Sequence, residues 1–132
     1  MYLADTSIWI DIFNNKSTKN IKELFEFQQI ALTSVIYFEI LQGCKNLSLF
    51  NKLKQILLEQ TFYPLKNKQK SYENAALIYL KCRKKGITIR SSIDCLIAQS
   101  AMENELILLH NDSDFVRIAS VITTLKQQYA DG

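Results

Sequence analysis

The stretch RSSIDCLIAQSAMENELILLHNDSDF, residues 90–115, decides the fold of this chain. Its first half has the apolar spacing of an amphipathic helix, and its second half opens on the apolar run Leu106–His110, which is typical of a buried strand. Acidic residues lie at both turning points, because Asp94 falls in the first turn of the predicted helix while Asp112 and Asp114 follow the strand directly. Carboxylates grouped where a strand reaches the edge of a sheet are what a divalent metal site needs.

The rest of the chain alternates between short strands and helices. The apolar run 1–4 ends at Asp5, Thr6 and Ser7 are possible caps, and helical spacing follows over residues 8–13. Further helices are predicted over residues 19–29, 34–44 with Ser34 as cap, 47–60 and 68–85, brief strands over 30–33 and 61–63, and a loop or strand over 87–89. Such alternation predicts an α/β protein whose mostly parallel sheet is covered by helices on both faces. Ligands of these sheets bind beyond the carboxyl ends of the strands, so Asp5 and Asp112 are expected to meet at one edge.

Length and composition indicate one domain over residues 1–132, with 48% apolar and 22% charged residues. No apolar run approaches the roughly 20 residues of a membrane span. The N-terminal segment carries Asp5 and Asp11 where a signal peptide would carry positive charge, so a cytoplasmic protein is expected. The 3 cysteines fall on separate predicted helices without CxxC spacing, which disfavours a disulfide framework or a zinc site.

Positive charge is unevenly distributed along the chain. The formal net charge is +3, and most of the basic surplus lies between Lys66 and Arg90. A mild basic patch fits a polyanionic partner, for which Arg90, Lys84 and Lys85 are the candidate binding residues. The alternative for this run is a solvated helix face.

Glu39 interrupts the apolar stripe of its predicted helix, where it shares a face with Ile36, Ile40 and Gly43. A carboxylate that faces the body of a protein costs several kcal/mol unless it is paired, hydrogen bonded or bound to a cation. Glu39 therefore needs a partner, or it rotates outward at the helix edge.

The aspartates also have simple structural interpretations as helix caps. Asp5 can cap the first helix, Ser91 and Asp94 match a capping box, and Asn111 or Asp112, with Asp114, can cap the last helix. Caps explain neither Glu39 nor the convergence of acids at one end of the sheet. Clustered carboxylates repel one another, and a bound divalent cation is the usual way in which proteins neutralise this repulsion.

An all-oxygen site of this kind suits Mg²⁺ or Mn²⁺ far better than zinc. His110, the one histidine, is expected to be structural, because no second histidine supports a role as ligand. A metal ion held by several acids lowers the pKa of a bound water and neutralises charge on a phosphate, which matches phosphodiester hydrolysis. The chain has neither GxxxxGK[ST] nor GxGxxG, so nucleotide-driven chemistry is disfavoured.

Four motifs, in this order, resemble a PIN domain: DTSIWID at 5–11, VIYFEILQG at 35–43, IDCLIA at 93–98 and LLHNDSDF at 108–115. More narrowly, the chain resembles the VapC-type toxins of bacterial and archaeal toxin–antitoxin pairs along essentially its whole length. The resemblance implies a three-layer α/β/α sandwich, Mg²⁺- or Mn²⁺-dependent endoribonuclease activity, a homodimer and inhibition by a cognate antitoxin.

The resemblance also assigns roles to individual residues. The catalytic acidic quartet is matched by Asp5, Glu39, Asp94 and Asp112, and the expected metal ligands are Asp5, Asp94, Asp112 and Asp114. Ser7 and Asn111 match positions where small polar residues assist. The antitoxin tail is expected in an apolar groove for which the candidates are Trp9, Phe13, Phe25 and Tyr37, unless these four are ordinary core.

Two other functions compete with the ribonuclease. The first is a catalytically silent PIN-fold binding module that acts through protein–protein or RNA complexes. The second is a phosphatase or another metal-dependent phosphoryl-transfer enzyme. It would need an aspartyl nucleophile in a setting such as DxD after the first strand, whereas Asp5 is followed by Thr6 and Ser7.

Overall fold

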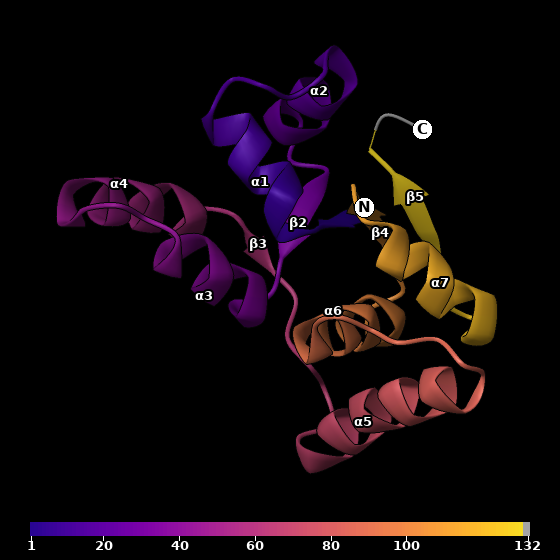
Figure 1. The fold of residues 1–132 in the computed structure, drawn as a ribbon. Coiled ribbons are helices and arrows are strands. Elements are labelled where there is room, and N and C mark those ends of the chain that lie inside the picture. The colour runs from indigo at the N-terminus through magenta and orange to yellow at the C-terminus, as the bar shows by residue number, and fades with distance from the viewer. Residues whose placement is uncertain (131–132) are drawn as a thin grey trace.

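The computed structural model describes residues 1–130 (Figure 1). Along the chain the elements are β1 (Tyr2–Ala4), α1 (Thr6–Phe13), α2 (Lys19–Glu26), β2 (Ile30–Leu32), α3 (Ser34–Gln42), α4 (Leu47–Leu58), β3 (Thr61–Phe62), α5 (Gln69–Lys84), α6 (Ser92–Glu103), β4 (Ile107–His110), α7 (Ser113–Val121) and β5 (Gln127–Tyr129). The strands form one sheet in the order β3-β2-β1-β4-β5, and every neighbouring pair is parallel. Within residues 1–130, no helix combines the length and apolar character needed to cross a membrane.

Two groups of helices cover the two faces of this sheet. The chain moves outward from β1 to β2 and β3, then returns past β1 to β4 and β5 on the other side. Because crossovers between parallel strands are right-handed, α1–α4 lie on one face and α5–α7 on the other. Figure 1 shows this division, with α1–α4 towards the upper left and α5–α7 towards the lower right. The predicted parallel sheet between helical layers is therefore confirmed.

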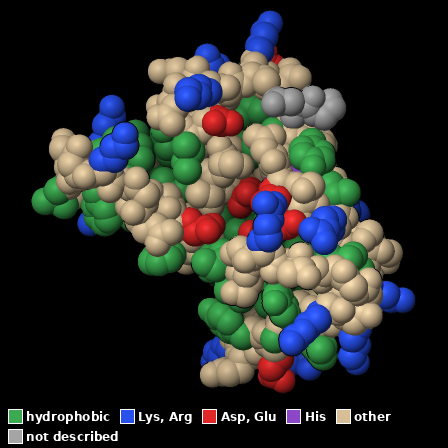
Figure 2. All heavy atoms as spheres, viewed as in Figure 1, with side chains coloured by type: hydrophobic (Ala, Val, Ile, Leu, Met, Phe, Trp, Pro, Cys, Tyr) green, Lys and Arg blue, Asp and Glu red, His purple; other side chains and the backbone are tan. Residues whose placement is uncertain are grey.

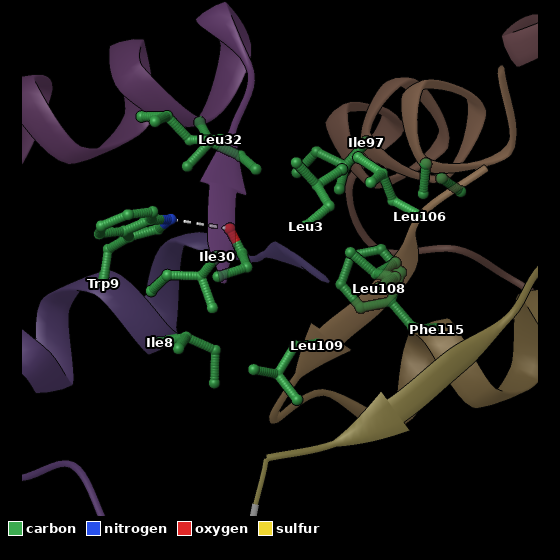
Figure 3. Close-up of a cluster of buried hydrophobic side chains, with 14 of the residues drawn as sticks. Leu3, Ile8, Trp9, Ile30, Leu32, Ile97, Leu106, Leu108, Leu109 and Phe115 are labelled. Atoms are coloured by element: carbon green, nitrogen blue, oxygen red, sulfur yellow. Dashed lines mark hydrogen bonds between the residues drawn. The ribbon is translucent and has the colours of Figure 1, made fainter. Parts of the chain in front are cut away.

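Strands β1 and β4 lie in the middle of the sheet and form the core with both helical layers. Leu3 and Leu108 are fully buried on the side of Ile97 and Phe115, from α6 and α7, whereas the buried Leu109 lies towards Ile8 of α1 (Figure 3). The Trp9 indole nitrogen donates a hydrogen bond to the Ala4 carbonyl at 3.0 Å, which ties α1 to the end of β1. Fully burying a Leu-sized side chain stabilises a fold by roughly 1.5–3 kcal/mol. This packing gives Asp5, the residue after β1, a fixed position.

The helix bounds differ from the sequence predictions by a few residues, for identifiable reasons. Thr33, and not Ser34, is the cap of α3, because its hydroxyl accepts a hydrogen bond from the Ile36 N–H at 3.2 Å. Helix α2 ends at Glu26, and Gln28 has φ of 55°, a left-handed conformation that cannot continue a right-handed helix.

Strand β5 lies at the edge of the sheet, and the sequence pattern does not indicate it. Its residues Gln127–Tyr129 are mostly polar and are partly or largely exposed. They are ordered as a strand through pairing with β4, in which Gln127 lies opposite Leu108. The segment 87–89, for which the sequence allows a loop or a strand, is a loop.

Candidate active site

The carboxyl ends of β1 and β4 lie side by side, and each is followed by an acid. The register pairs Ala4 with Leu109, and the Asp5 N–H donates to the Leu109 carbonyl at 2.9 Å. Asp112 follows Leu109 by three residues, so both acids emerge at the same edge of the sheet. Figure 2 shows acidic side chains gathered near the middle of the face in view, with basic side chains beside them.

Three carboxylates form the compact centre of this edge. One oxygen each from Asp94, Asp112 and Asp114 lies within 4.8 Å of the other two. Asp94 reaches the cluster from the first turn of α6, and its carboxylate accepts no hydrogen bond from residues 1–130. The Ser91 side chain makes no capping bond either, so the predicted capping box is wrong.

Burial and mutual repulsion raise the pKa of two of these acids. The pKa of Asp94 is raised to about 7, first by burial and then by the charges of Asp5, Asp112, Asp114 and Glu39. The pKa of Asp5 is raised to about 6, first by burial, with further contributions from Glu39 and Asp112. Near neutral pH the three clustered carboxylates, together with Asp5 and Glu39, therefore carry less negative charge than five ionised acids would.

Asp5, after β1, and Glu39, on α3, lie outside this group of three but near enough for their charges to raise the pKa of Asp94. Asp5 occupies the N-cap position of α1, as the cap interpretation expects, but its side chain makes no capping hydrogen bond. Glu39 is half-buried and accepts a hydrogen bond from the Thr6 hydroxyl at 2.7 Å. That bond turns Glu39 towards α1, which removes the alternative in which it rotates outward into solvent.

Two arginines neutralise the acids at the start of α7. Arg90 pairs with Asp114 through Nε and with Asp112 through a terminal nitrogen, each at 3.0 Å. Arg117 pairs with the other oxygen of Asp114 at 3.3 Å. Asp112 also caps α7, as predicted, by accepting from the Asp114 N–H at 2.9 Å.

His110 supports the backbone of this turn. Its Nδ1 accepts from the Asp112 N–H at 3.1 Å, and its Nε2 lies 2.7 Å from the Gln127 amide oxygen. Burial lowers the pKa of His110, so the ring is neutral at pH 7, with Nδ1 as acceptor and Nε2 as donor. Both ring nitrogens are thus engaged within the protein, as expected for a structural histidine.

The remaining candidates lie around this centre. Lys84 and Lys85 are exposed at the end of α5 and make no ion pair within residues 1–130. The buried Ser7 hydroxyl has no hydrogen-bond partner there, and Asn111 is exposed. Sequence reasoning missed the roles of Thr6, Arg117 and Gln127. Only Arg117 had a signal, because it follows Asp114 by three residues on a helix.

An apolar groove with a volume of about 570 Å³ opens between α1, α2, α3 and α4. Phe13 and Phe25 line it, as expected, together with Ile10, Leu49 and neighbouring residues. Trp9 was expected in the groove but is fully buried in the core, where it packs against both phenylalanines. Tyr37 is also absent from the lining, because its ring packs edge-on against Phe62.

The donor chemistry of the cluster fits a divalent, oxygen-binding cation. Every donor that converges there is a carboxylate oxygen, without cysteine and without a free histidine nitrogen among residues 1–130. Such donors suit Mg²⁺ or Mn²⁺. The raised pKa values of Asp5 and Asp94 mark two carboxylates that lack a counter-charge of their own.

Comparison with known proteins identifies the family. The PIN domain model matches residues 2–121, so the chain belongs to the PIN domain family. Among curated proteins, it is 31% identical to Ribonuclease VapC11 of Mycobacterium tuberculosis over 128 residues, which cover 92% of this chain and 93% of that protein.

Solved structures show the same fold at lower identity. VapBC2 from Rickettsia felis, bound to a DNA fragment from its promoter, gives a TM-score of 0.77 at 21% identity and covers 97% of each chain. A toxin–antitoxin complex from Klebsiella pneumoniae gives a TM-score of 0.69 at 21% identity, covering 96% of this chain and 99% of that chain. The α/β fold is therefore shared along almost the whole chain.

Proposed function

We propose that this chain is a metal-dependent endoribonuclease, the toxin of a type II toxin–antitoxin pair. The observation that carries the proposal is the group of acids that β1, α3, α6 and β4 bring to one edge of the sheet. Relatives named VapC ribonucleases support RNA as the substrate class. One domain over residues 1–132, acting in the cytoplasm, is part of the same proposal.

Within this proposal the acids have catalytic and metal-binding roles. Asp5, Glu39, Asp94 and Asp112 are the catalytic residues, and Asp5, Asp94 and Asp112 hold Mg²⁺ or Mn²⁺, with Asp114 beside them. When bound, the ion supplies activation of a water molecule and neutralisation of phosphate charge. Thr6 holds the Glu39 carboxylate in place through its 2.7 Å hydrogen bond.

Cleavage of RNA by the purified chain tests the proposal. Single-stranded RNA should be cut in Mg²⁺ or Mn²⁺ and left intact in EDTA, and Asp5→Asn should abolish the cutting. Asp11→Asn is the matched control, because Asp11 lies on α1 but is not among the acids whose charges raise the pKa of Asp94. A wild-type protein that folds and binds metal but leaves RNA intact would favour the silent binding module instead.

The apolar groove is the proposed seat of the antitoxin. Its lining is mostly apolar, and Lys45 and Lys52 add positive charge, so an amphipathic segment with acidic residues fits it. Helix α1 runs from Thr6, in contact with Glu39, to the groove residue Phe13, a span of about 10 Å at 1.5 Å per residue. A segment seated in the groove can therefore reach the acids with a basic side chain.

Expression in cells tests the toxin assignment. The chain alone should arrest growth, and co-expression with the adjacent open reading frame should restore it. Asp5→Asn should be harmless at equal protein level. Harmless expression of a folded chain that cleaves RNA in vitro would contradict the toxin role while leaving the ribonuclease intact.

A homodimer is the proposed assembly. Helix α5 exposes Tyr72, Leu77 and Leu80, and a hollow of about 210 Å³ lies between α5 and α6. Exposed apolar side chains of this size are typical of interaction surfaces. Sedimentation should give a dimer that Tyr72→Lys with Leu80→Lys converts to a monomer.

A further inference from the structure

We propose that Arg90 is a built-in cation of the active site, which gives up Asp112 to the divalent ion and then contacts the RNA phosphate. This inference rests on the proposed function for its second half, the phosphate contact. Its first half, exchange between a guanidinium and a metal ion at Asp112, concerns only this chain and the ion.

The two acids that Arg90 bridges are held very differently. Asp114 is 1% exposed, and each of its oxygens faces an arginine. Asp112 is 34% exposed, and Arg90 is its only ion-pair partner within residues 1–130. Removing a cation from a buried carboxylate is costly, whereas breaking an exposed ion pair costs little. The Asp112 pair is therefore the one that Arg90 can give up.

Arg90 is anchored at Asp114 independently of Asp112. Its Nε donates to the Asp114 Oδ2 at 3.0 Å, and its backbone N–H faces the same oxygen at 3.4 Å. The terminal nitrogen that reaches Asp112 lies at the far end of a guanidinium whose side chain is 71% exposed. When Asp112 turns to a divalent ion, this nitrogen is released at the mouth of the site while Nε stays bound.

A guanidinium nitrogen released beside the acidic site can bind a phosphate group of RNA. Guanidinium groups bind phosphate oxygens with charge-assisted hydrogen bonds, and an acidic cluster without a nearby cation repels its own substrate. Asp114 then serves as the positioning residue that aims Arg90, which explains why a buried acid in this cluster is already neutralised by two arginines.

Direct titration with Mn²⁺ tests the exchange without any RNA. Arg90→Met removes the competing cation at similar side-chain length, so Mn²⁺ affinity measured by calorimetry should rise about three- to fivefold. Arg117→Met is the matched control: it removes an equal charge from Asp114 and leaves Asp112 paired, so its effect should be clearly smaller. Unchanged or weaker Mn²⁺ binding by Arg90→Met, or an equal gain from Arg117→Met, would overturn the exchange.

Binding of a short labelled RNA tests the phosphate contact. Measured in Ca²⁺ to slow hydrolysis, wild-type affinity should exceed that of Arg90→Met about three- to tenfold, and addition of the cation should strengthen RNA binding more in wild type than in Arg90→Met. Tighter Mn²⁺ binding together with unchanged RNA affinity would overturn the phosphate contact alone. A wild-type chain that binds Mn²⁺ as expected but cuts no RNA refutes the proposed function and leaves the exchange standing.

Discussion

Asp94 is the acid whose charge the folded protein tolerates least. It is half-buried, it accepts no hydrogen bond from residues 1–130, and its pKa of about 7 reflects burial and four neighbouring acids. The amide of asparagine has nearly the same shape and no charge. A change to asparagine therefore separates the electrostatic role of this residue from its packing.

We expect Asp94→Asn to raise the metal-free Tm at pH 8 by about 2–4 °C and to remove most of the increase that Mg²⁺ produces. Thermal unfolding with and without Mg²⁺ measures both effects. A variant that is markedly less stable without metal would show that Asp94 has a structural role, and its place in the metal site would be wrong.

His110 is the second residue that a single substitution can test. Its Nδ1 accepts the Asp112 N–H, and this bond fixes the turn that presents the Asp112 carboxylate. A threonine at position 110 would place its hydroxyl two residues before the Asp112 N–H, where it can accept the same hydrogen bond in a short turn. Valine has the shape of threonine but no hydrogen-bond acceptor.

His110→Val should therefore weaken Mn²⁺ binding about threefold to tenfold, and His110→Thr should restore part of that affinity. Both variants lack the bond to Gln127 and the same ring packing, so the difference between them reports the Asp112 bond alone. Equal Mn²⁺ affinities in the two variants would show that His110 acts only through its packing.

At the scale of the element, the end of α5 carries Lys81, Arg83, Lys84 and Lys85, in the last turn and just beyond it. These side chains are exposed and free of ion pairs within residues 1–130. A helix C-terminus favours such cations through its dipole, which by itself explains a solvated basic end. If these side chains also bind RNA, their charges must in addition contribute to RNA affinity.

Reversing Lys84 and Lys85 to glutamate should weaken RNA binding and reduce the slope of log affinity against log salt by about 0.7 for each phosphate that is no longer neutralised. Mn²⁺ binding should be unchanged. Lys19→Glu with Lys22→Glu is the control, since it makes the same change in net charge on α2, which lies on the opposite face of the sheet. If the slope of log RNA affinity against log salt is the same in the two double variants, the basic residues at the end of α5 form only a solvated helix face.

At the scale of the whole molecule, metal and pH act on the same acids. The folded chain keeps protons on Asp5 and Asp94 up to pH values of about 6 and about 7, whereas a model aspartate loses its proton near 3.8. Between these limits the folded state binds more protons than the unfolded state, so metal-free stability falls as pH rises through the window. A divalent ion instead requires both carboxylates ionised.

The metal-free Tm should therefore decrease between pH 5 and pH 8, while the increase in Tm at a fixed Mg²⁺ concentration should grow. Each proton displaced on binding makes the affinity rise about tenfold per pH unit below the pKa of its carboxyl. Thermal unfolding across this range, with Asp5→Asn and Asp94→Asn as controls, measures both slopes. A metal-free Tm that rises steadily to pH 8 would contradict the raised pKa values.

The sequence by itself determined the architecture and the location of the acids. Alternating strand and helix patterns required parallel crossovers, and parallel strands bring their carboxyl ends to one edge, so Asp5 and Asp112 had to converge whatever the side chains between them did. Helical spacing likewise placed Glu39 on the stripe of Ile36 and Ile40, although its inward orientation depends on the hydrogen bond from Thr6. These features follow from local periodicity, which each segment carries in its own residues.

Only the tertiary structure decided which groups face these acids. Arg90 reaches Asp112 and Asp114 because the loop before α6 passes the start of α7, and Gln127 reaches His110 because β5 pairs with β4. Trp9 belongs to the core rather than to the groove because its indole binds the last carbonyl of β1. Such interactions join residues far apart in the chain, and their geometry depends on how whole elements pack, which no local pattern records.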